Sequence, residues 1–141
     1  MKKLVITGVV LVVALGSFFY NFINRTTNLN TGVMTIVVVD SIGDTVHNDE
    51  IVFAVGDTLF EIMNGEYDLQ CANNQYQPGT CDSTPFFGRV VMSIDEVQTD
   101  WSNNYLAIYV NNSYSNYGID DIPLEDETEY RFEYTVVGDE D

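Results

Sequence analysis

The feature that most constrains the fold of this chain is an uncharged apolar stretch, Leu4–Ile23, which directly follows Lys2 and Lys3. A helix of roughly 20 apolar residues spans a bilayer, whereas the apolar region of a cleaved signal peptide has about 7–15 residues. Cleavage after Gly16 is the alternative, but it would leave an exposed, aromatic-rich N-terminus. A buried core helix is disfavoured because the stretch has no polar face. We therefore expect residues 1–24 to form an uncleaved signal anchor, an N-terminal transmembrane helix.

The charge of the chain is strongly negative and unevenly distributed. All 22 Asp and Glu residues lie beyond Arg25, where the only other Lys or Arg residues are Arg89 and Arg131. The two lysines before the apolar stretch favour a cytoplasmic N-terminus, which would leave the remainder outside the cytosol. A surface this acidic repels nucleic acid and anionic lipid headgroups. We expect a single-pass cell membrane protein whose C-terminal domain is extracytoplasmic and binds no nucleic acid.

The chain contains two cysteines, Cys71 and Cys81, both beyond the apolar stretch. Outside the cytosol a disulfide persists, and closing so short a loop stabilises the fold by about 2–3 kcal/mol. A structural zinc site needs four ligands, and the only histidine, His47, is far away in the sequence. We predict a Cys71–Cys81 disulfide; two free thiols are the alternative in a species without an oxidising export pathway.

The residues after the apolar stretch divide into a linker, one folded domain and a tail. Residues 25–32 are polar and lack periodicity, which is typical of a linker, and residues 138–141 form an acidic tail. Residues 33–137 are long enough for one small domain. Alternating apolar residues, many of them β-branched, predict strands at 34–39, 50–55, 89–97, 105–110 and 129–137.

The pattern changes to a helical period between the second and third of these strands. Asp57 or Thr58 can cap a helix whose apolar side chains begin in residues 59–63, and Gly65 is expected to end it. Residues 67–87 then read as a long irregular insert that holds both cysteines. One short helix packed on one face of a curved mixed sheet is an α+β architecture, here with the layout of a β-grasp fold.

Four segments of this domain resemble one bacterial family. GDTLFEIM, at residues 56–63, resembles its "G-x-T-hydrophobic" helix opening, and residues 87–94 resemble the strand that follows. WSNNYLAIYVNN, at residues 101–112, is similar to its "W-x-y-x-v-N-g" hairpin, and residues 117–135 are similar to its "D-G-D-x-i-x-x-x-Y" segment. On these motifs the chain resembles the transcobalamin-like C-terminal domain family, a bacterial domain of unknown function related to the C-terminal β domain of cobalamin carriers.

The resemblance covers roughly residues 34–137 and implies the fold of that family. In animal cobalamin carriers, domains of this type hold one side of the vitamin while a helical barrel closes the other, and this chain has no residues left for a barrel. Two family glycines are replaced by Asn112 and Glu127, which suggests a divergent member and puts a tight turn near Glu127 in question. Function must be argued from the site, because a fold does not imply a function.

The sequence contains no recognisable catalytic or metal-binding pattern. His47 is expected at an exposed turn position, and no Ser-His-Asp, Cys-His, phosphate-loop or H-E-x-x-H arrangement is present. The acidic residues within 120–127 could supply oxygen ligands to calcium, but their spacing is not that of an EF-hand, so a solvated loop is favoured. We therefore expect no enzymatic activity, no metal site and no cofactor.

Aromatic and amide side chains gather between residues 101 and 117. Tyr and Trp provide large contact areas with a polar group, and Asn adds adaptable hydrogen bonds. Such a surface suits a planar ring system, a sugar or a peptide, although packing of the sheet accounts for such aromatic residues equally well. The predicted ligand-binding residues are Trp101, Tyr105, Tyr109, Asn112, Tyr114 and Tyr117.

Two functions fit these features. The first is a membrane-anchored extracytoplasmic module that binds a small, corrinoid-like ligand for a membrane transporter in nutrient uptake. It predicts a concave site between residues 101–117 and the loop closed by Cys71 and Cys81. The alternative is a cell-surface protein-interaction or adhesion scaffold without a small ligand, which predicts a contiguous exposed aromatic patch.

Overall fold

The computed structural model describes residues 30–82 and 88–138. The predicted transmembrane helix, residues 1–24, lies outside these ranges. Among the described residues, no helix has both the length and the apolar character needed to cross a membrane. The first strand, β1 (Gly32–Val39), begins at the last residue of the predicted linker.

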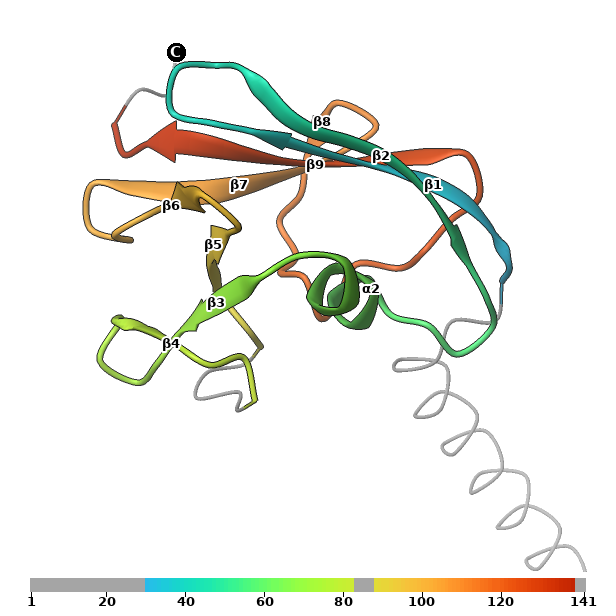
Figure 1. Ribbon diagram of the computed structural model, residues 1–141, viewed down its shortest axis with the longest axis horizontal. Helices are drawn as coiled ribbons and strands as arrows, with labels where there is room; N and C mark the ends of the chain where they lie inside the picture. The colour runs from blue at the N-terminus through green and yellow to red at the C-terminus, as the bar shows by residue number, and fades with distance from the viewer. Residues whose placement is uncertain (1–29, 83–87, 139–141) are drawn as a thin grey trace, which may run out of the picture.

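A mixed five-stranded sheet carries much of the core, in the order β2-β1-β9-β7-β8 (Figure 1). The β1 and β9 strands pair in parallel, and the other neighbouring pairs are antiparallel. Alternation along β9 places Tyr130 and Phe132, which are fully buried, on the core face, as the sequence predicts. The strands that join β1 are β2 (Thr45–Phe53), β7 (Asn104–Val110), β8 (Ser113–Tyr114) and β9 (Thr128–Val136).

A second sheet, in the order β4-β3-β5-β6, includes part of the segment predicted to be irregular. That prediction is wrong for β3 and β4, because β3 is stabilised by pairing with the distant β5, which no local pattern reveals. The predicted strand at 89–97 is two short strands joined by a turn at Asp95. The Cys71–Cys81 disulfide is confirmed, and both cysteines are buried. The strands are β3 (Leu69–Ala72), β4 (Pro78–Gly79), β5 (Val91–Ile94) and β6 (Val97–Gln98).

The helix α2 (Leu59–Glu66) lies below the larger sheet in Figure 1. Its N-cap is Thr58, whose hydroxyl accepts a hydrogen bond from the Glu61 N–H at 3.2 Å. The apolar side chains of the helix are part of the same core as the sheet, which confirms the α+β class. The predicted end at Gly65 is wrong by one residue: the helix continues to Glu66, and the extended Tyr67 closes it by donating its N–H to the Met63 carbonyl.

His47 lies within β2 and not at the exposed turn position that the sequence suggested. That prediction was wrong because β2 pairs with β1 over nearly its whole length and so begins earlier than its own apolar pattern. His47 Nε2 lies 2.8 Å from a carboxylate oxygen of Asp95. Because Asp95 stands in the turn between β5 and β6, this contact links the two sheets. The centroids of the His47 and Tyr67 rings are 4.9 Å apart. The Tyr67 hydroxyl donates a hydrogen bond to the Asp49 carboxylate at 2.7 Å. Burial, followed by the Asp49 carboxylate, raises the pKa of Tyr67 well above its usual value.

The tight turn near Glu127 forms without the glycine of the family. Glu127 adopts a left-handed conformation, with φ of 56°, and its N–H donates to the Val33 carbonyl at 2.8 Å. The Asp126 carboxylate accepts the Val33 N–H at 2.8 Å. A side chain at Gly32 would come within 2.7 Å of the Asp126 Cβ, so the start of β1 requires glycine at this contact. These hydrogen bonds therefore fix the turn before β9 to the first residues of β1.

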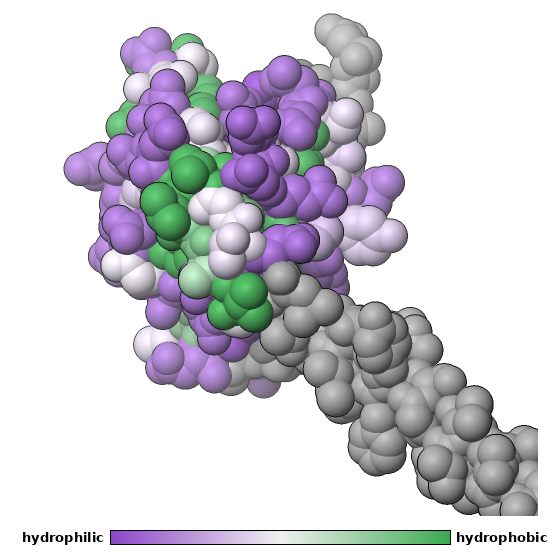
Figure 2. Space-filling view, turned by 90° about the vertical axis from the view of Figure 1, so that its right-hand side faces the viewer, coloured by the Kyte–Doolittle hydropathy of each residue, from purple (hydrophilic) through white to green (hydrophobic). Residues whose placement is uncertain are grey.

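The surface of the domain is largely hydrophilic, in keeping with the net charge of −17 for the chain. Figure 2 shows one face on which hydrophilic groups surround an apolar area near the middle. Negative charges on a surface repel anions and attract cations over distances of several ångströms. Neutral or cationic partners are therefore favoured over anionic ones.

Candidate functional site

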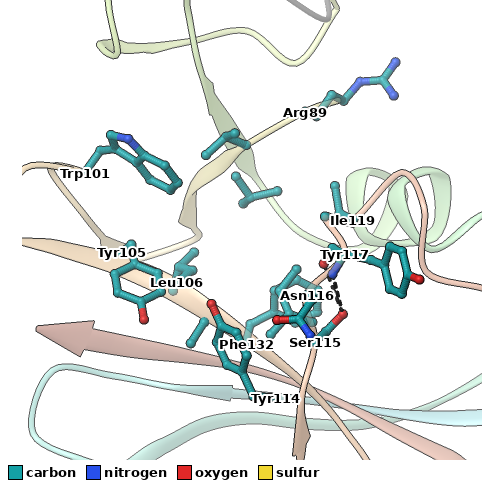
Figure 3. A pocket seen from close by; sticks show the side chains of 15 residues that line it. Arg89, Trp101, Tyr105, Leu106, Tyr114, Ser115, Asn116, Tyr117, Ile119 and Phe132 are labelled. Carbon is teal, nitrogen blue, oxygen red and sulfur yellow. Dashed lines mark hydrogen bonds between the residues drawn. The ribbon is translucent and has the colours of Figure 1, made fainter. Parts of the chain in front are cut away.

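A pocket of about 280 Å³ lies between β7 and the segment that leads into β5. The outer edge of β7 forms one wall, and Arg89–Val91 form the opposite wall. Trp101 lies at one end, and the chain that follows β8, through Tyr117 to Ile119, lies at the other (Figure 3). The pocket is therefore assembled from segments that the fold, and not the local sequence, brings together.

Trp101 is held at the pocket by a turn centred on Asp100. The Asp100 carboxylate accepts hydrogen bonds from the backbone and side-chain N–H groups of Asn103, at 2.8 and 2.9 Å, and these bonds lower the pKa of Asp100. The backbone of Trp101 is left-handed, with φ of 62°. Its ring is nearly parallel to that of Tyr76, with centroids 6.4 Å apart, and edge-on to that of Tyr105 at 6.3 Å. Three aromatic rings thus form one continuous rim.

A tight hairpin turn sets the other end of the pocket. Asn111 and Asn112 both have positive φ, 47° and 67°, which a two-residue hairpin turn requires and asparagine tolerates. The chain then returns along β7, where the Ser115 N–H donates to the Ile108 carbonyl at 2.8 Å. The Ser115 hydroxyl accepts the Tyr117 N–H at 3.1 Å, which fixes the Tyr117 backbone while its side chain stays exposed. The aromatic ring of Tyr117 is therefore available to a ligand.

The structure brings four of the six predicted ligand-binding residues to this pocket and separates the other two from it. The Arg131 guanidinium lies over the Tyr109 ring, with its central carbon 4.6 Å from the ring centroid. The Asn112 side-chain oxygen accepts a hydrogen bond from the same guanidinium at 2.7 Å. Both therefore pack against β9. The role of the other four in binding stays a prediction; they are Trp101, Tyr105, Tyr114 and Tyr117.

Arg89 is a pocket residue that the sequence does not reveal, since a lone arginine before a strand belongs to no motif. Its guanidinium points away from the pocket (Figure 3) and pairs with Asp120. It also donates to the Cys81 carbonyl at 2.9 Å and lies 3.8 Å over the ring of Phe60. Arg89 thus fixes the pocket wall against the helix and the disulfide loop, and its charge is neutralised by Asp120.

The disulfide loop contributes less to the pocket than the sequence suggested. The concave site was predicted between residues 101–117 and the loop closed by Cys71 and Cys81, but the described loop residues do not line the pocket. The loop approaches the site through Tyr76, which contacts Trp101, and through Cys81, which contacts Arg89. Its role is therefore to support two of the walls.

The chemistry of the lining suits binding through rings and neutral polar groups. The side-chain polar groups are the hydroxyls of three tyrosines, the Trp101 indole N–H, the Ser115 hydroxyl and the Asn116 amide. Among the described lining residues, Arg89 is the only ionised one. Within residues 30–82 and 88–138, no group of three or more His, Cys, Asp or Glu side chains could hold a metal ion. A neutral or cationic ligand with a planar or apolar part matches this lining.

Comparison with known proteins gives one family and one fold. The model of the family described as "Domain of unknown function (DUF4430)" matches residues 56–136. This match confirms the resemblance to the transcobalamin-like C-terminal domain family. No curated protein matches the chain significantly.

Two solved structures are similar in fold. A candidate metal binding protein from Ruminococcus gnavus ATCC 29149 aligns with a TM-score of 0.54 and 15% identity, over 74% of this chain and 97% of that one. Haptocorrin in complex with Cbi aligns with a TM-score of 0.56 and 7% identity, over 76% of this chain and 25% of its own. The chain therefore corresponds to about a quarter of haptocorrin, and at these identities the likeness concerns the fold alone.

Proposed function

Because the chain belongs to the family described as Domain of unknown function (DUF4430), we propose that it is a membrane-tethered extracytoplasmic module that binds a small ligand and catalyses no reaction. The observation that carries this proposal is the pocket beside β7, with its aromatic rim and its neutralised arginine. Aromatic rings give a ligand large contact area at low entropic cost. None of the described residues that line the pocket is a histidine or a carboxylate that could act as a general base.

A corrinoid-like ligand is the first class to test. Haptocorrin, which shares the fold, is recorded in complex with Cbi. The pocket volume of about 280 Å³ is just below the range of roughly 300–1,000 Å³ for small-molecule sites. A corrin-sized molecule would therefore contact the pocket with one part and leave the rest accessible to a membrane transporter or surface protein, which would receive the ligand.

The location follows from two features of the chain. The Cys71–Cys81 disulfide supports an oxidising compartment, and the apolar stretch Leu4–Ile23 supports a single membrane span. Separation of cell membranes from soluble extract, followed by protease treatment of intact cells, tests both. Recovery of the full-length chain in the soluble fraction with reduced thiols would contradict this part of the proposal.

Titration of the full-length chain in detergent with cobalamin, cobinamide and haem tests ligand binding. The only tryptophan, Trp101, lies at the pocket, so its fluorescence reports occupancy directly. We expect saturable quenching with a corrinoid and about tenfold weaker binding in Tyr117→Ala, since one aromatic contact is worth about 1.4 kcal/mol. Ile42→Ala, an exposed side chain outside the pocket, is the matched control. The absence of any absorbance or fluorescence change with all three compounds would reject the corrinoid class.

A further inference from the structure

The orientation of the backbone along β7 follows from the hydrogen bonds at its two ends. At one end, the Asn103 carbonyl accepts the Val137 N–H at 2.8 Å, and at the other, the Asn111 N–H donates to the Glu129 carbonyl at 2.9 Å. Both odd-numbered residues therefore direct their backbone groups toward β9. Since successive residues of a strand alternate, the even-numbered residues of β7 direct theirs away from β9, toward the pocket.

Two of these even-numbered residues have partners on the outer side, and the one between them does not. The Asn104 N–H donates to Asp100 at 3.3 Å, and the Ile108 carbonyl accepts the Ser115 N–H at 2.8 Å. The N–H and C=O of Leu106, which lies in the pocket wall, belong to no strand pairing on that side among the described residues. Leu106, of which 8% is exposed, therefore presents one unpaired donor and one unpaired acceptor on the pocket side of β7.

This open edge lacks the usual protection against pairing with another chain. The strand β7, NYLAIYV, contains no proline and no charged residue, and β8 covers only Tyr109 and Val110. The opposite edge strand, β2, carries Asp49 and Glu50. Charges and prolines are the common means of preventing edge pairing, and the outer edge of β7 has neither.

We propose that an extended, positively charged peptide segment of a partner protein pairs with the outer edge of β7, exchanging two backbone hydrogen bonds with Leu106. One residue of an added antiparallel strand makes both bonds. The stretch between the bonded Asn104 N–H and the bonded Ile108 carbonyl is about 13 Å long at roughly 3.3 Å per residue. Only the central residues of the peptide therefore pair with β7, around Leu106. Alternate side chains of the peptide would contact the apolar lining that includes Val91 and Ile119.

Charge selects a cationic partner over a second copy of this chain. The chain carries a net charge of −17, so two copies repel each other, whereas a lysine-rich or arginine-rich segment is attracted. The exposed carboxylate of Asp100 lies next to Trp101 in the sequence, at one end of the edge, and is an acidic partner for a lysine of the peptide. This interaction goes beyond the proposed small-ligand function and does not depend on it, and it gives the protein-interaction alternative a defined surface.

Binding of synthetic peptides to the full-length chain in neutral detergent tests the proposal. The probe is a blocked peptide of about six residues in which lysine and valine alternate, followed through the fluorescence of Trp101. We expect saturable binding, and at least about tenfold weaker binding when the central amides are N-methylated, because methylation removes the donor and blocks the approach of the strand. A peptide with glutamate in place of lysine is expected to bind more weakly still.

Matched variants separate edge pairing from general attraction. Asp100→Asn keeps one side-chain oxygen for the backbone N–H groups of the turn, gives up the acceptor of the Asn103 side chain and removes the charge. We expect about threefold weaker binding of the lysine peptide. Glu50→Gln removes one charge from the opposite sheet edge and is expected to leave the affinity unchanged. Equal effects of the two variants would show attraction to the whole surface and would overturn the proposal.

Hydrogen exchange at individual amides locates the bound peptide. At saturation, the Leu106 amide is expected to exchange at least about tenfold more slowly, while amides of β2 are unchanged. Undiminished binding of the N-methylated peptide, protection confined to other strands, or no binding at about millimolar peptide would each overturn the proposal. So would concentration-dependent self-association that protects Leu106, which would make a second copy the occupant.

Discussion

Asp120 accepts hydrogen bonds from both the main-chain N–H and the guanidinium of Arg89, across 31 positions of sequence. The two side chains are mostly buried, and the guanidinium also contacts Phe60 and the Cys81 carbonyl. This one carboxylate therefore connects the loop after the pocket to the helix, the disulfide loop and the start of β5. Its removal offers a direct test of how the pocket is held together.

Asp120→Ala is expected to lower the free energy of unfolding by about 2 kcal/mol, because it leaves a partly buried guanidinium and a backbone N–H without their acceptor. Urea denaturation followed by circular dichroism measures the change. Glu129→Ala is the control, since its carboxylate lies 3.7 Å from Arg131 at the surface and is worth less than about 0.5 kcal/mol. Equal losses in the two variants would contradict the role assigned to Asp120.

Glu127→Gly is expected to raise the free energy of unfolding by about 0.5–1 kcal/mol. Glu127 has a φ of 56°, and a left-handed conformation costs a residue with a side chain roughly 1–2 kcal/mol, part of which the greater flexibility of unfolded glycine offsets. Thermal unfolding measures the gain. Glu125→Gly, where φ is not positive, is the control and should be destabilising; a loss of stability in Glu127→Gly itself would refute the argument.

Removal of the disulfide is expected to cost about 2–3 kcal/mol, since the loop between Cys71 and Cys81 is short. The Cys71→Ala and Cys81→Ala double variant should show this loss in urea denaturation. It should also alter the fluorescence of Trp101, because Tyr76, which stacks on the indole, lies inside the loop. A reducing agent should destabilise the natural chain and leave the double variant unaffected; sensitivity of both would point to another cause.

Stability is expected to fall as the pH rises above about 10, the ordinary pKa of tyrosine. The pKa of Tyr67 is raised by burial and by Asp49, and that of Tyr130 is raised chiefly by burial. The unfolded chain then loses these protons at a lower pH than the folded chain, so alkali favours unfolding until the folded pKa values are reached. Tyr67→Phe should reduce the fall of the free energy of unfolding with pH, measured by denaturation at several pH values above about 10. An unchanged slope of free energy against pH would contradict the role of Tyr67.

Much of the secondary structure was predictable because its signals are local. The alternation in β9, the Thr58 cap and the positive φ at Asn111 and Asn112 each depend on a few neighbouring residues. The disulfide was predictable by elimination, since the chain has only two cysteines. The helix and strand signals among these features are enough to predict the α+β class, because neither requires a contact between distant residues.

The candidate site was predictable only in part. Aromatic composition identified the correct region, yet it could not separate Tyr105, which lines the pocket, from Tyr109, which packs under Arg131. Arg89 gave no sequence signal, because its partner Asp120 is distant in the chain. Composition records which side chains are present, whereas contacts depend on which strands become neighbours.

By itself, the sequence determined the elements with strong local signals, such as β9 and the start of α2, together with the acidic charge and the pairing of the two cysteines, because each depends on residue type or on residues close together. Only the tertiary structure decided the parallel pairing of β1 with β9, the place of His47 between the two sheets, and the open backbone of Leu106. These depend on the order of strands in the sheets, which is set by the burial of the whole core at once. The pocket and the free edge of β7 are consequences of that order.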